Sequence, residues 1–349
     1  MYWPRIGDME NNRAEEKKLN IAVVKQDTDD DFLPDCGLPW SVFFDTLVRE
    51  GHKIVSIWSD PDVVVFMNHH EKMLKKLRKK NLKLITVMVI WESPVTRPGD
   101  FQAKKLKNYR LILTPTKVWT PDLNYVVFPW PQGQSTYNRK MFDEFTNRDN
   151  RAIVFQNNKF SFIQGELYSL RRAIVGEFYQ DLIVCGQGWN NSLAILLNLF
   201  RGIIQAGKAR KSLHFPRNVW VKAPNYLGII AEKKELLEKF KITIVIENSM
   251  DYVSEKLFEA LWAGCCVLYV GPNLKEHGLP DLAIQCPPSR EAIYQIYLDL
   301  LNDEASMNRI RKNAQAYLLS ENFQRLRNDN VLRSMAKSIS TEVQGFGAV

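Results

Sequence analysis

The 349-residue sequence is poor in cysteine and histidine, with five of each, and it contains no long apolar run. The cysteines are scattered or lie within apolar segments, and none is spaced with histidine as in a zinc site. We therefore expect reduced, mostly buried thiols, as in a cytosolic protein. No stretch approaches the length of a membrane-spanning helix. The polar residues 1–18 lack the apolar core of a signal peptide, so we expect a flexible N-terminus and a cytoplasmic protein.

The overall charge is basic, with a formal net charge of +8. Hydrophobic residues make up 45% and charged residues 25% of the chain, which are ordinary values for a globular protein of two domains. Part of the charge lies in one run, made of Lys72, Lys75, Lys76, Arg78, Lys79, Lys80 and Lys83. Such a run is usually a solvated helix face, and it also suits peripheral contact with anionic lipid. No nucleic-acid-binding motif accompanies it, so we do not expect nucleic acid as a partner.

Strand-like and helix-like segments alternate along the chain. Apolar strand-like segments lie at 20–25, 52–58, 63–66, 82–91, 109–114, 125–128, 152–156, 181–185, 241–246, 265–270 and 283–286. Helix-like segments include an apolar one at 192–204 with a basic stretch at 201–211, an amphipathic one at 227–240 and a last one at 322–339. This order predicts an α/β protein with parallel sheets. We place the domains at 19–150 and 151–320, and a C-terminal helix and tail at 321–349.

Residues 241–272 carry the most informative pattern. A β-branched apolar strand is followed by a polar cluster and then by a helix, for which Ser254 is a suitable N-cap and Gly264 a C-terminal stop. The next apolar strand follows at 265–270. The segment is therefore predicted to form a βαβ unit, whose two strands are parallel and whose crossover is right-handed.

Polar side chains gather at the junction between that first strand and its helix: Glu247, Asn248, Tyr252, Glu255 and Lys256. The carboxyl end of a parallel strand and the N-terminus of a helix together favour an anionic ligand such as a phosphate. A carboxylate there accepts hydrogen bonds from sugar or ribose hydroxyls. An ordinary turn with a solvated Glu–Lys pair is the simpler interpretation, but the number of such residues favours a binding site.

Two further candidates lie elsewhere in the chain. The strand at 82–91 ends in Glu92-Ser93-Pro94, which presents one carboxylate at a strand end, either to a cleft or simply to solvent. The helix at 166–179 carries Arg171 and Arg172, either a phosphate-binding arginine or a surface pair. The adjacent His69 and His70 point to opposite faces if they lie on a strand, and we expect no catalytic metal.

The residues Glu247-Asn248-Ser249, 251–256, Ala263-Gly264 and 269–272 resemble the donor-binding signature of the α-1,3-fucosyltransferase family. The resemblance implies a GT-B fold, in which two Rossmann-like domains face each other and a C-terminal helix crosses back to the first. It also implies an inverting glycosyltransferase that needs no cofactor beyond its co-substrate GDP-fucose. The acceptor would be a glycan, such as a surface lipopolysaccharide antigen.

The resemblance also implies roles for single residues. Glu92 matches the family's general base, which deprotonates the acceptor hydroxyl. An arginine of the 166–179 helix would contact the donor diphosphate; spacing does not separate Arg171 from Arg172, and we favour Arg171. Lys256 would stabilise the leaving diphosphate. Glu255 and Tyr252 would hold the ribose or the sugar, and Asn248 and Glu247 would line the same pocket.

Three other interpretations stay open. The spacing of Glu247 and Glu255 is also typical of retaining GT-B enzymes, so a retaining or non-fucose hexosyltransferase is the alternative within the enzymes. A second alternative is a non-catalytic nucleotide-binding or glycan-binding protein, which would tolerate loss of Glu92. A third is a basic adaptor that binds anionic membrane or nucleic acid through the 72–83 run.

Overall fold

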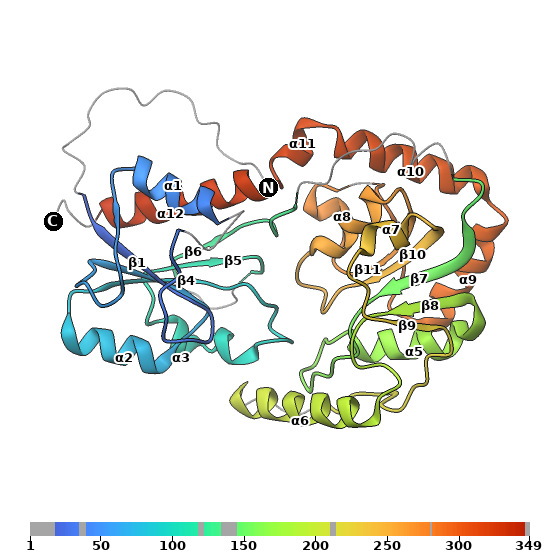
Figure 1. Ribbon diagram of the computed structural model, residues 1–349, viewed down its shortest axis with the longest axis horizontal. Coiled ribbons are helices and arrows are strands. Elements are labelled where there is room, and N and C mark those ends of the chain that lie inside the picture. Colours follow the sequence, from blue (N-terminus) through green and yellow to red (C-terminus); the bar gives the residue numbers. More distant parts are fainter. Residues whose placement is uncertain are drawn as a thin grey trace.

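The computed structural model describes residues 18–34, 40–117, 122–133, 145–209, 214–279 and 281–345. Cys36 and most of the predicted flexible N-terminus lie outside these residues. The described chain forms two six-stranded sheets, and neighbouring strands within each of them pair in parallel. The sheets lie in two lobes beside each other (Figure 1). The predicted α/β class with parallel sheets is therefore confirmed.

The first sheet has the strand order β2-β1-β3-β4-β5-β6. Its strands are β1 (Asn20–Val24), β2 (Lys53–Ile54), β3 (Val63–Met67), β4 (Ile85–Val89), β5 (Leu111–Thr114) and β6 (Tyr125–Val127). The helices of this lobe are α1 (Ser41–Arg49), α2 (Glu71–Lys80), η1 (Pro98–Phe101) and α3 (Ala103–Leu106). All five residues of β3 are buried, as expected of a central parallel strand covered on both faces. Figure 1 shows α1 on one face of this sheet and α2 on the other.

The second sheet has the order β12-β11-β10-β7-β8-β9. Its strands are β7 (Asp149–Phe155), β8 (Leu182–Cys185), β9 (Tyr226–Gly228), β10 (Phe240–Ile246), β11 (Cys266–Val270) and β12 (Ile284–Gln285). The helices are α5 (Tyr168–Phe178), η2 (Tyr179–Asp181), α6 (Ser192–Ala209), α7 (Lys233–Leu237), α8 (Glu255–Trp262), η3 (Lys275–His277), α9 (Arg290–Leu301), α10 (Glu304–Leu318) and α11 (Glu321–Gln324). The predicted βαβ unit is confirmed, since β10 and β11 pair in parallel around α8.

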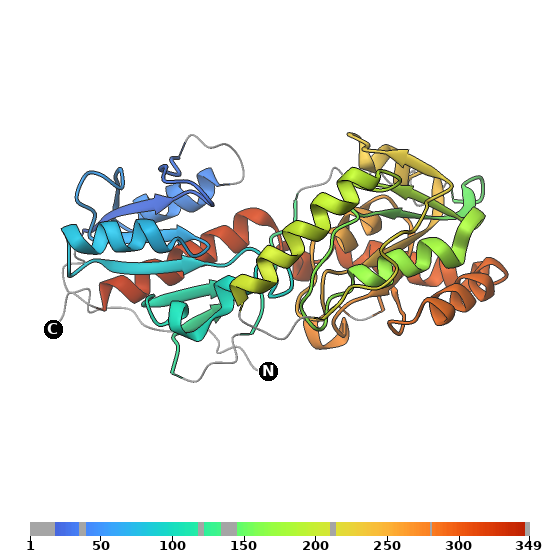
Figure 2. The same ribbon diagram turned by 90° about the horizontal axis from the view of Figure 1, so that it is seen from below.

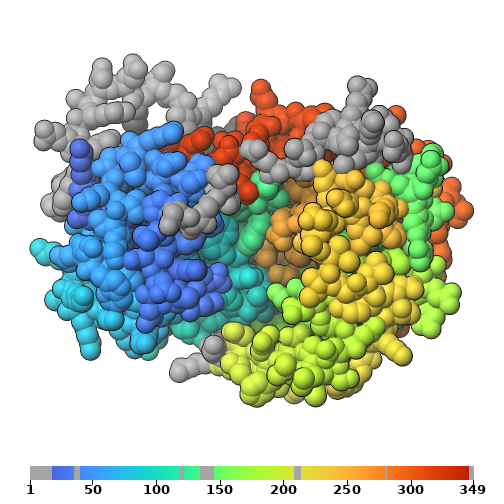
Figure 3. Space-filling model, in the orientation of Figure 1, coloured from blue at the N-terminus to red at the C-terminus, as the bar shows by residue number. Residues whose placement is uncertain are grey.

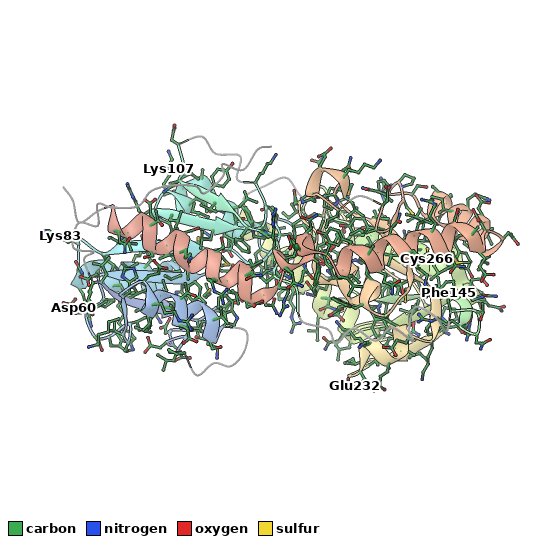
Figure 4. All side chains as sticks on the ribbon, turned by 90° about the horizontal axis from the view of Figure 1, so that it is seen from above. Asp60, Lys83, Lys107, Phe145, Glu232 and Cys266 are labelled. Carbon is green, nitrogen blue, oxygen red and sulfur yellow. The ribbon has the colours of Figure 1, made fainter. Side chains whose placement is uncertain are left out.

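The last helix, α12 (Asn328–Gln344), returns to the first lobe. Its residues Leu332, Met335 and Ile339 are buried in the same apolar cluster as α1 and the first sheet. Seen from above, α12 lies along the lobe that carries Asp60 and Lys83, away from the lobe of Cys266 (Figure 4). The predicted C-terminal crossing helix is confirmed.

Several predicted elements differ from the structure, among them the strand predicted at 52–58, of which only Lys53–Ile54 forms β2. The predicted helix at 227–240 is wrong, because its start forms β9 at the edge of the second sheet, and only α7 is helical. The predicted helix at 322–339 is broken into α11 and α12, because the backbone of Gln132 bonds Leu326 and Asn328 between them. The strand predicted at 82–91 is shorter than expected, since β4 spans only Ile85–Val89.

None of the described helices is long and apolar enough to cross a membrane. The four cysteines within the described part of the chain are free and buried, which agrees with the expectation from their apolar surroundings.

The packing of α12 makes the first lobe depend on a distant part of the chain. We expect Ile339→Ala, which removes a fully buried side chain, to lower the free energy of unfolding by about 2–5 kcal/mol. Lys337→Ala, on the exposed side of the same helix, is the matched control and is expected to stay within about 0.5 kcal/mol of wild type. Urea unfolding measures both; equal stability of the two variants would contradict this packing.

Candidate active site

The strand order of the second sheet predicts where a ligand binds. Along the chain, β7, β8 and β9 follow one another towards one edge of the sheet, and β10, β11 and β12 follow one another towards the other edge. β7 and β10 are therefore neighbours at the point where the order reverses. In open α/β sheets, ligands bind at the carboxyl ends of the strands at such a point. The residues that follow β10 are Glu247 and Asn248, and those that follow β7 reach Lys159. The 247–256 junction therefore lies at the crevice of this sheet.

Glu247 is the structural centre of the junction. Its side chain is fully buried, and its carboxylate accepts hydrogen bonds from the backbone N–H of Ser254 at 2.8 Å and from the hydroxyl of Ser254 at 2.7 Å. The Nζ of Lys256 lies 3.3 Å from the same carboxylate. Ser254 is the observed N-cap of α8, as predicted. The side chain of Glu247 thus links the end of β10 to the start of α8. It lies inside the protein and does not face solvent.

Gly271 leaves the space that Glu247 needs. A Cβ at this position would lie 2.8 Å from Cγ of Glu247 and still closer to the phenol of Tyr269. Real Cβ atoms essentially never approach other heavy atoms so closely. The glycine belongs to the quoted 269–272 motif, but sequence reasoning assigned it no part in the site. Only the contact across β10 and β11 reveals its role.

The two candidate arginines of α5 point to different places. Arg171 donates hydrogen bonds to the carbonyl of Ile246, at 2.6 and 3.1 Å, and to Oδ1 of Asn248 at 2.9 Å. Asn248 in turn donates to the hydroxyl of Tyr252 at 3.2 Å. Arg171, Asn248 and Tyr252 therefore form one network at the end of β10. The guanidinium of Arg171 is buried, and burial lowers its pKa.

Arg172 lies outside that network. It donates to the backbone carbonyls of Arg217 and Lys159, and its guanidinium lies 4.1 Å from the ring centre of Phe160. Arg172 is fully buried and joins two loops of the second lobe. Of the two arginines that spacing left unresolved, the structure brings only Arg171 to Asn248.

Glu92 reaches the same region from the first lobe. It follows the end of β4, and burial raises the pKa of its carboxyl. The positive charges of Lys159 and Lys256, from the second lobe, and of Arg97 oppose this rise. The negative charge of Glu255 adds to it. A carboxylate of the first sheet is therefore electrostatically coupled to the helix start of the second.

Two tyrosines of the second lobe also lie within the field of Glu92. Burial raises the pKa of both Tyr168 and Tyr252, and the charge of Glu92 contributes to the rise in each case. Lys159 is the residue that sequence reasoning missed, since the polar end of its strand was given no role. Its position at the carboxyl end of β7, next to β10, is the signal that would have found it.

Direct contacts between the lobes position the loop that follows Glu92. The hydroxyl of Thr96 lies 3.0 Å from that of Tyr168, and Ser161 donates to the carbonyl of Val95 at 2.7 Å. Val95 also belongs to an apolar cluster with residues of the second lobe, including Ala206 of α6. The space-filling view shows the two lobes in contact at the middle of the molecule (Figure 3).

A cavity of about 420 Å³ lies at the equivalent crevice of the first sheet. This sheet reverses its order between β1 and β3, and residues at the ends of both strands line the cavity. Its lining residues are Lys25, Gln26, Phe32, Trp40, Met67, Trp91, Trp130, Pro131, Asn328 and Leu332. Most of this surface is apolar or aromatic, with a few polar groups, as is typical of a small-molecule site.

A series of aromatic rings connects this cavity to the second lobe. The ring centres of Trp40 and Trp91 are 5.1 Å apart, and those of Trp91 and Trp130 are 5.4 Å apart. Trp130 stacks on Tyr252 at 5.2 Å, with 28° between the ring planes. Tyr252 thus belongs to the Arg171–Asn248 network and also packs on Trp130, a ring that lines the cavity. No role was assigned to Trp130 from the sequence.

Within the described residues, no group of three or more His, Cys, Asp or Glu side chains is placed to hold a metal. The two adjacent histidines have other partners. His69 contacts Tyr109 and Glu71, while His70 caps α2 and lies 3.1 Å from Asp29.

Comparison with known proteins yields a fold and not a family. No family model matches the chain, and no curated protein matches it. Among solved structures, HepE of Anabaena in complex with UDP-glucose has a TM-score of 0.56 at 11% identity, covering 93% of this chain and all of that one. An α-glucosyltransferase in complex with UDP and a 13-mer DNA has a TM-score of 0.51 at 12% identity, covering 93% and 99%.

These similarities assign the chain to the GT-B fold, which the resemblance of the 247–272 motif had implied. A second HepE structure, in complex with UDP, agrees, with a TM-score of 0.51 at 12% identity over 86% of this chain and 82% of that one. All three of these structures are complexes with UDP or UDP-glucose. The fucosyltransferase family itself receives no support from these comparisons.

The space at Gly271 can be tested directly. We expect Gly271→Ala to displace Glu247, and with it the start of α8, so that the protein loses at least about 1–3 kcal/mol of stability, as overpacked cores do. Gly176→Ala in α5 is the matched control, because a Cβ there meets nothing within 4 Å; it is expected to be neutral or slightly stabilising. Thermal unfolding of both variants is the measurement, and unchanged stability of Gly271→Ala would contradict the assigned role.

Proposed function

We propose that the protein is a glycosyltransferase that moves a sugar from a nucleotide-sugar donor, held at the crevice of the second sheet, to an acceptor hydroxyl on the first. The observation that carries this proposal is the gathering of Arg171, Asn248, Tyr252 and Lys256 at the carboxyl end of β10, where the second sheet reverses its strand order. The GT-B fold supports it, and so do the similar structures, which were solved with UDP or UDP-glucose.

The donor diphosphate would lie at the N-terminus of α8. Free backbone N–H groups and the helix dipole favour negative charge there. Lys256 would leave its contact with Glu247 to neutralise the leaving group, while Arg171 contributes its charge from beneath the site. Glu255 and Tyr252 would hold the ribose or the sugar, with Asn248 fixing the hydroxyl of Tyr252. Lys159 would add a further positive charge near the diphosphate.

Glu92 would act as the general base. Its carboxylate takes the proton of the acceptor hydroxyl as that oxygen attacks the anomeric carbon, the bond to the diphosphate breaks, and the configuration inverts. Burial raises the pKa of this carboxyl, which favours proton transfer near neutral pH. The acceptor would be a glycan, since the aromatic cavity offers flat apolar rings to the faces of sugar rings and a few polar groups to their hydroxyls.

Two donors are candidates. The 247–272 motif favours GDP-fucose, and the UDP and UDP-glucose of the similar structures favour a UDP-hexose. The retaining alternative depended on Glu247 and Glu255 both lining the donor site. The hydrogen bonds between Glu247 and Ser254 argue against Glu247 as a ligand-binding residue, which makes that alternative the weaker one.

Donor binding is tested by calorimetry with GDP, UDP, GDP-fucose and UDP-glucose. We expect one nucleotide series to bind selectively. We expect Lys256→Ala to weaken that binding at least about tenfold, because the substitution removes one full positive charge that would contact the diphosphate. Lys233→Ala, which removes an exposed lysine paired with Glu259 on α8, is the control and is expected to bind as wild type. Selective UDP binding would replace GDP-fucose by a UDP-hexose. Absence of binding to all four ligands would contradict the proposed function.

The role of Glu92 is tested by Glu92→Gln. We expect nucleotide release in the presence of acceptor glycans to fall by about 10²–10⁴-fold, the usual contribution of a general base, while nucleotide affinity stays unchanged. Glu232→Gln, an exposed glutamate on the second lobe, is the control (Figure 4). Full activity of Glu92→Gln would contradict the inverting mechanism.

The same variant has a stability signature. The raised pKa means that the contribution of Glu92 to folding is most favourable below the ordinary glutamate pKa and is lost as the pH rises through the raised value. We therefore expect Glu92→Gln to melt at or above the wild-type temperature at neutral pH, and this difference to vanish near pH 4. A variant that melts lower at neutral pH would show that the charge of Glu92 stabilises the fold.

A further inference from the structure

Helix α6 packs in the reverse of the usual way. The residues that it buries are Ile195 and the small Gly202 and Ala206. A Cβ at Gly202 would lie 3.0–3.1 Å from Phe160 and Phe162, so the helix approaches the second lobe closely at this point. Surface helices of globular proteins normally turn their large apolar side chains inward. Here two of the three buried residues are small, and six large apolar side chains are left outside.

The outer side of α6 is a continuous apolar stripe. It is made of Leu193, Leu196, Leu197, Phe200, Ile203 and Ile204, each between 43% and 67% exposed. These positions are spaced three, four, seven, ten and eleven residues from the first, which places them on one face of a helix. Phe215, which is 73% exposed, contacts Phe162 beneath the same helix. We call the six α6 residues the α6 stripe. Contiguous exposed apolar surface of this kind marks an interaction site.

The chain that contains the stripe carries charge of one sign. Residues 182–231 contain six lysines and arginines and no aspartate or glutamate: Arg201, Lys208, Arg210, Lys211, Arg217 and Lys222. Arg201 is exposed and flanks the stripe at one side of the helix. Long basic side chains at such positions can extend to headgroup phosphates while their neighbours enter the acyl region. A basic helix with a leucine and phenylalanine face is typical of peptides that lie in the membrane interface.

Within the described residues, neither lobe covers the face of α6 that carries the stripe. Figure 1 shows α6 on the opposite side of the molecule from α10 and α11, and Figure 2 shows it running along that side towards the first lobe. There α6 contacts η1, which leads into α3 with Lys104 exposed. At 18 residues and about 1.5 Å per residue, the helix offers roughly 27 Å of surface parallel to a bilayer.

We infer that the α6 stripe docks the protein on an anionic lipid bilayer, with α6 in the plane of the interface and its basic residues at the headgroups. This inference is independent of the proposed enzymatic function. A second copy of the chain is the other occupant to consider, but a like-charged surface with no acidic residue in 182–231 does not complement itself.

The basic run of α2 is a poorer membrane surface than α6. Its apolar residues Met73, Leu74 and Leu77 are buried against the first sheet, and Lys76 and Lys80 lie over the ring of Trp58. A bilayer would meet charge there, with only the isolated Trp58 and Leu82 as apolar contacts. The expected peripheral membrane contact is therefore moved from the 72–83 run to α6.

Flotation with phosphatidylcholine vesicles, with and without 30 mol% phosphatidylglycerol, tests the inference on the full chain. We expect binding to the anionic vesicles that falls as salt is raised, and little binding to the neutral ones. The double variant Leu197→Glu/Phe200→Glu is expected to bind at least about tenfold more weakly, because two apolar side chains no longer enter the bilayer. Both side chains are exposed, so the variant is expected to keep its melting temperature.

Two controls separate this surface from others. Leu82→Glu alters the most exposed of the large apolar side chains in the described chain, next to α2, and Lys75→Ala/Lys79→Ala removes charge from α2 itself. Both are expected to bind anionic vesicles as wild type. Hydrogen exchange supplies a measurement without mutation, since the amides of α6 should gain protection when wild-type protein binds vesicles.

Several results would overturn the inference. They are absence of vesicle binding, wild-type binding by Leu197→Glu/Phe200→Glu, or loss of binding in the α2 variants alone. A wild-type dimer in solution that the α6 variant dissociates, without vesicle binding, would assign the stripe to a second copy of the chain.

Discussion

The buried carboxylate of Glu247 is the interaction on which the candidate site depends. It ends the central strand β10, receives two hydrogen bonds from Ser254, and thereby fixes where α8 begins. Because the buried side chain of Glu247 joins the end of β10 to the start of α8, the other polar residues of the 247–256 junction have defined positions. A buried charge is stable only when it is paired and hydrogen-bonded, and Lys256 and Ser254 meet both conditions.

The site is completed only where the two lobes meet. Glu92 follows β4, Lys256 lies on α8 and Lys159 follows β7, and each is far from the others in sequence. The contact between Thr96 and Tyr168 joins the loop after Glu92 to the start of α5. The aromatic series that ends in Trp130 and Tyr252 links the cavity of the first sheet to the crevice of the second. The two crevices, one at each sheet's point of reversal, are therefore connected by stacked aromatic side chains.

Much of the fold follows from local pattern, because buried parallel strands are continuous apolar runs and helix ends carry their own signals. β3, β10 and β11 were all recognisable in this way, and so was the cap at Ser254. Pattern failed at 227–240, where pairing at a sheet edge outweighed helical periodicity. It failed again near Leu326, where backbone hydrogen bonds to Gln132 interrupt a helix.

The sequence by itself determined the class of fold, the βαβ unit of residues 241–270, and the polar types gathered at its junction, because all of these depend on neighbours along the chain. Only the tertiary structure decided that Arg171 and not Arg172 reaches Asn248, and that Glu247 lies beneath the site. It also decided that α6 turns its large apolar side chains outward. The physical reason is that burial and hydrogen bonding are properties of surfaces brought together by folding, and local spacing does not determine which surfaces meet.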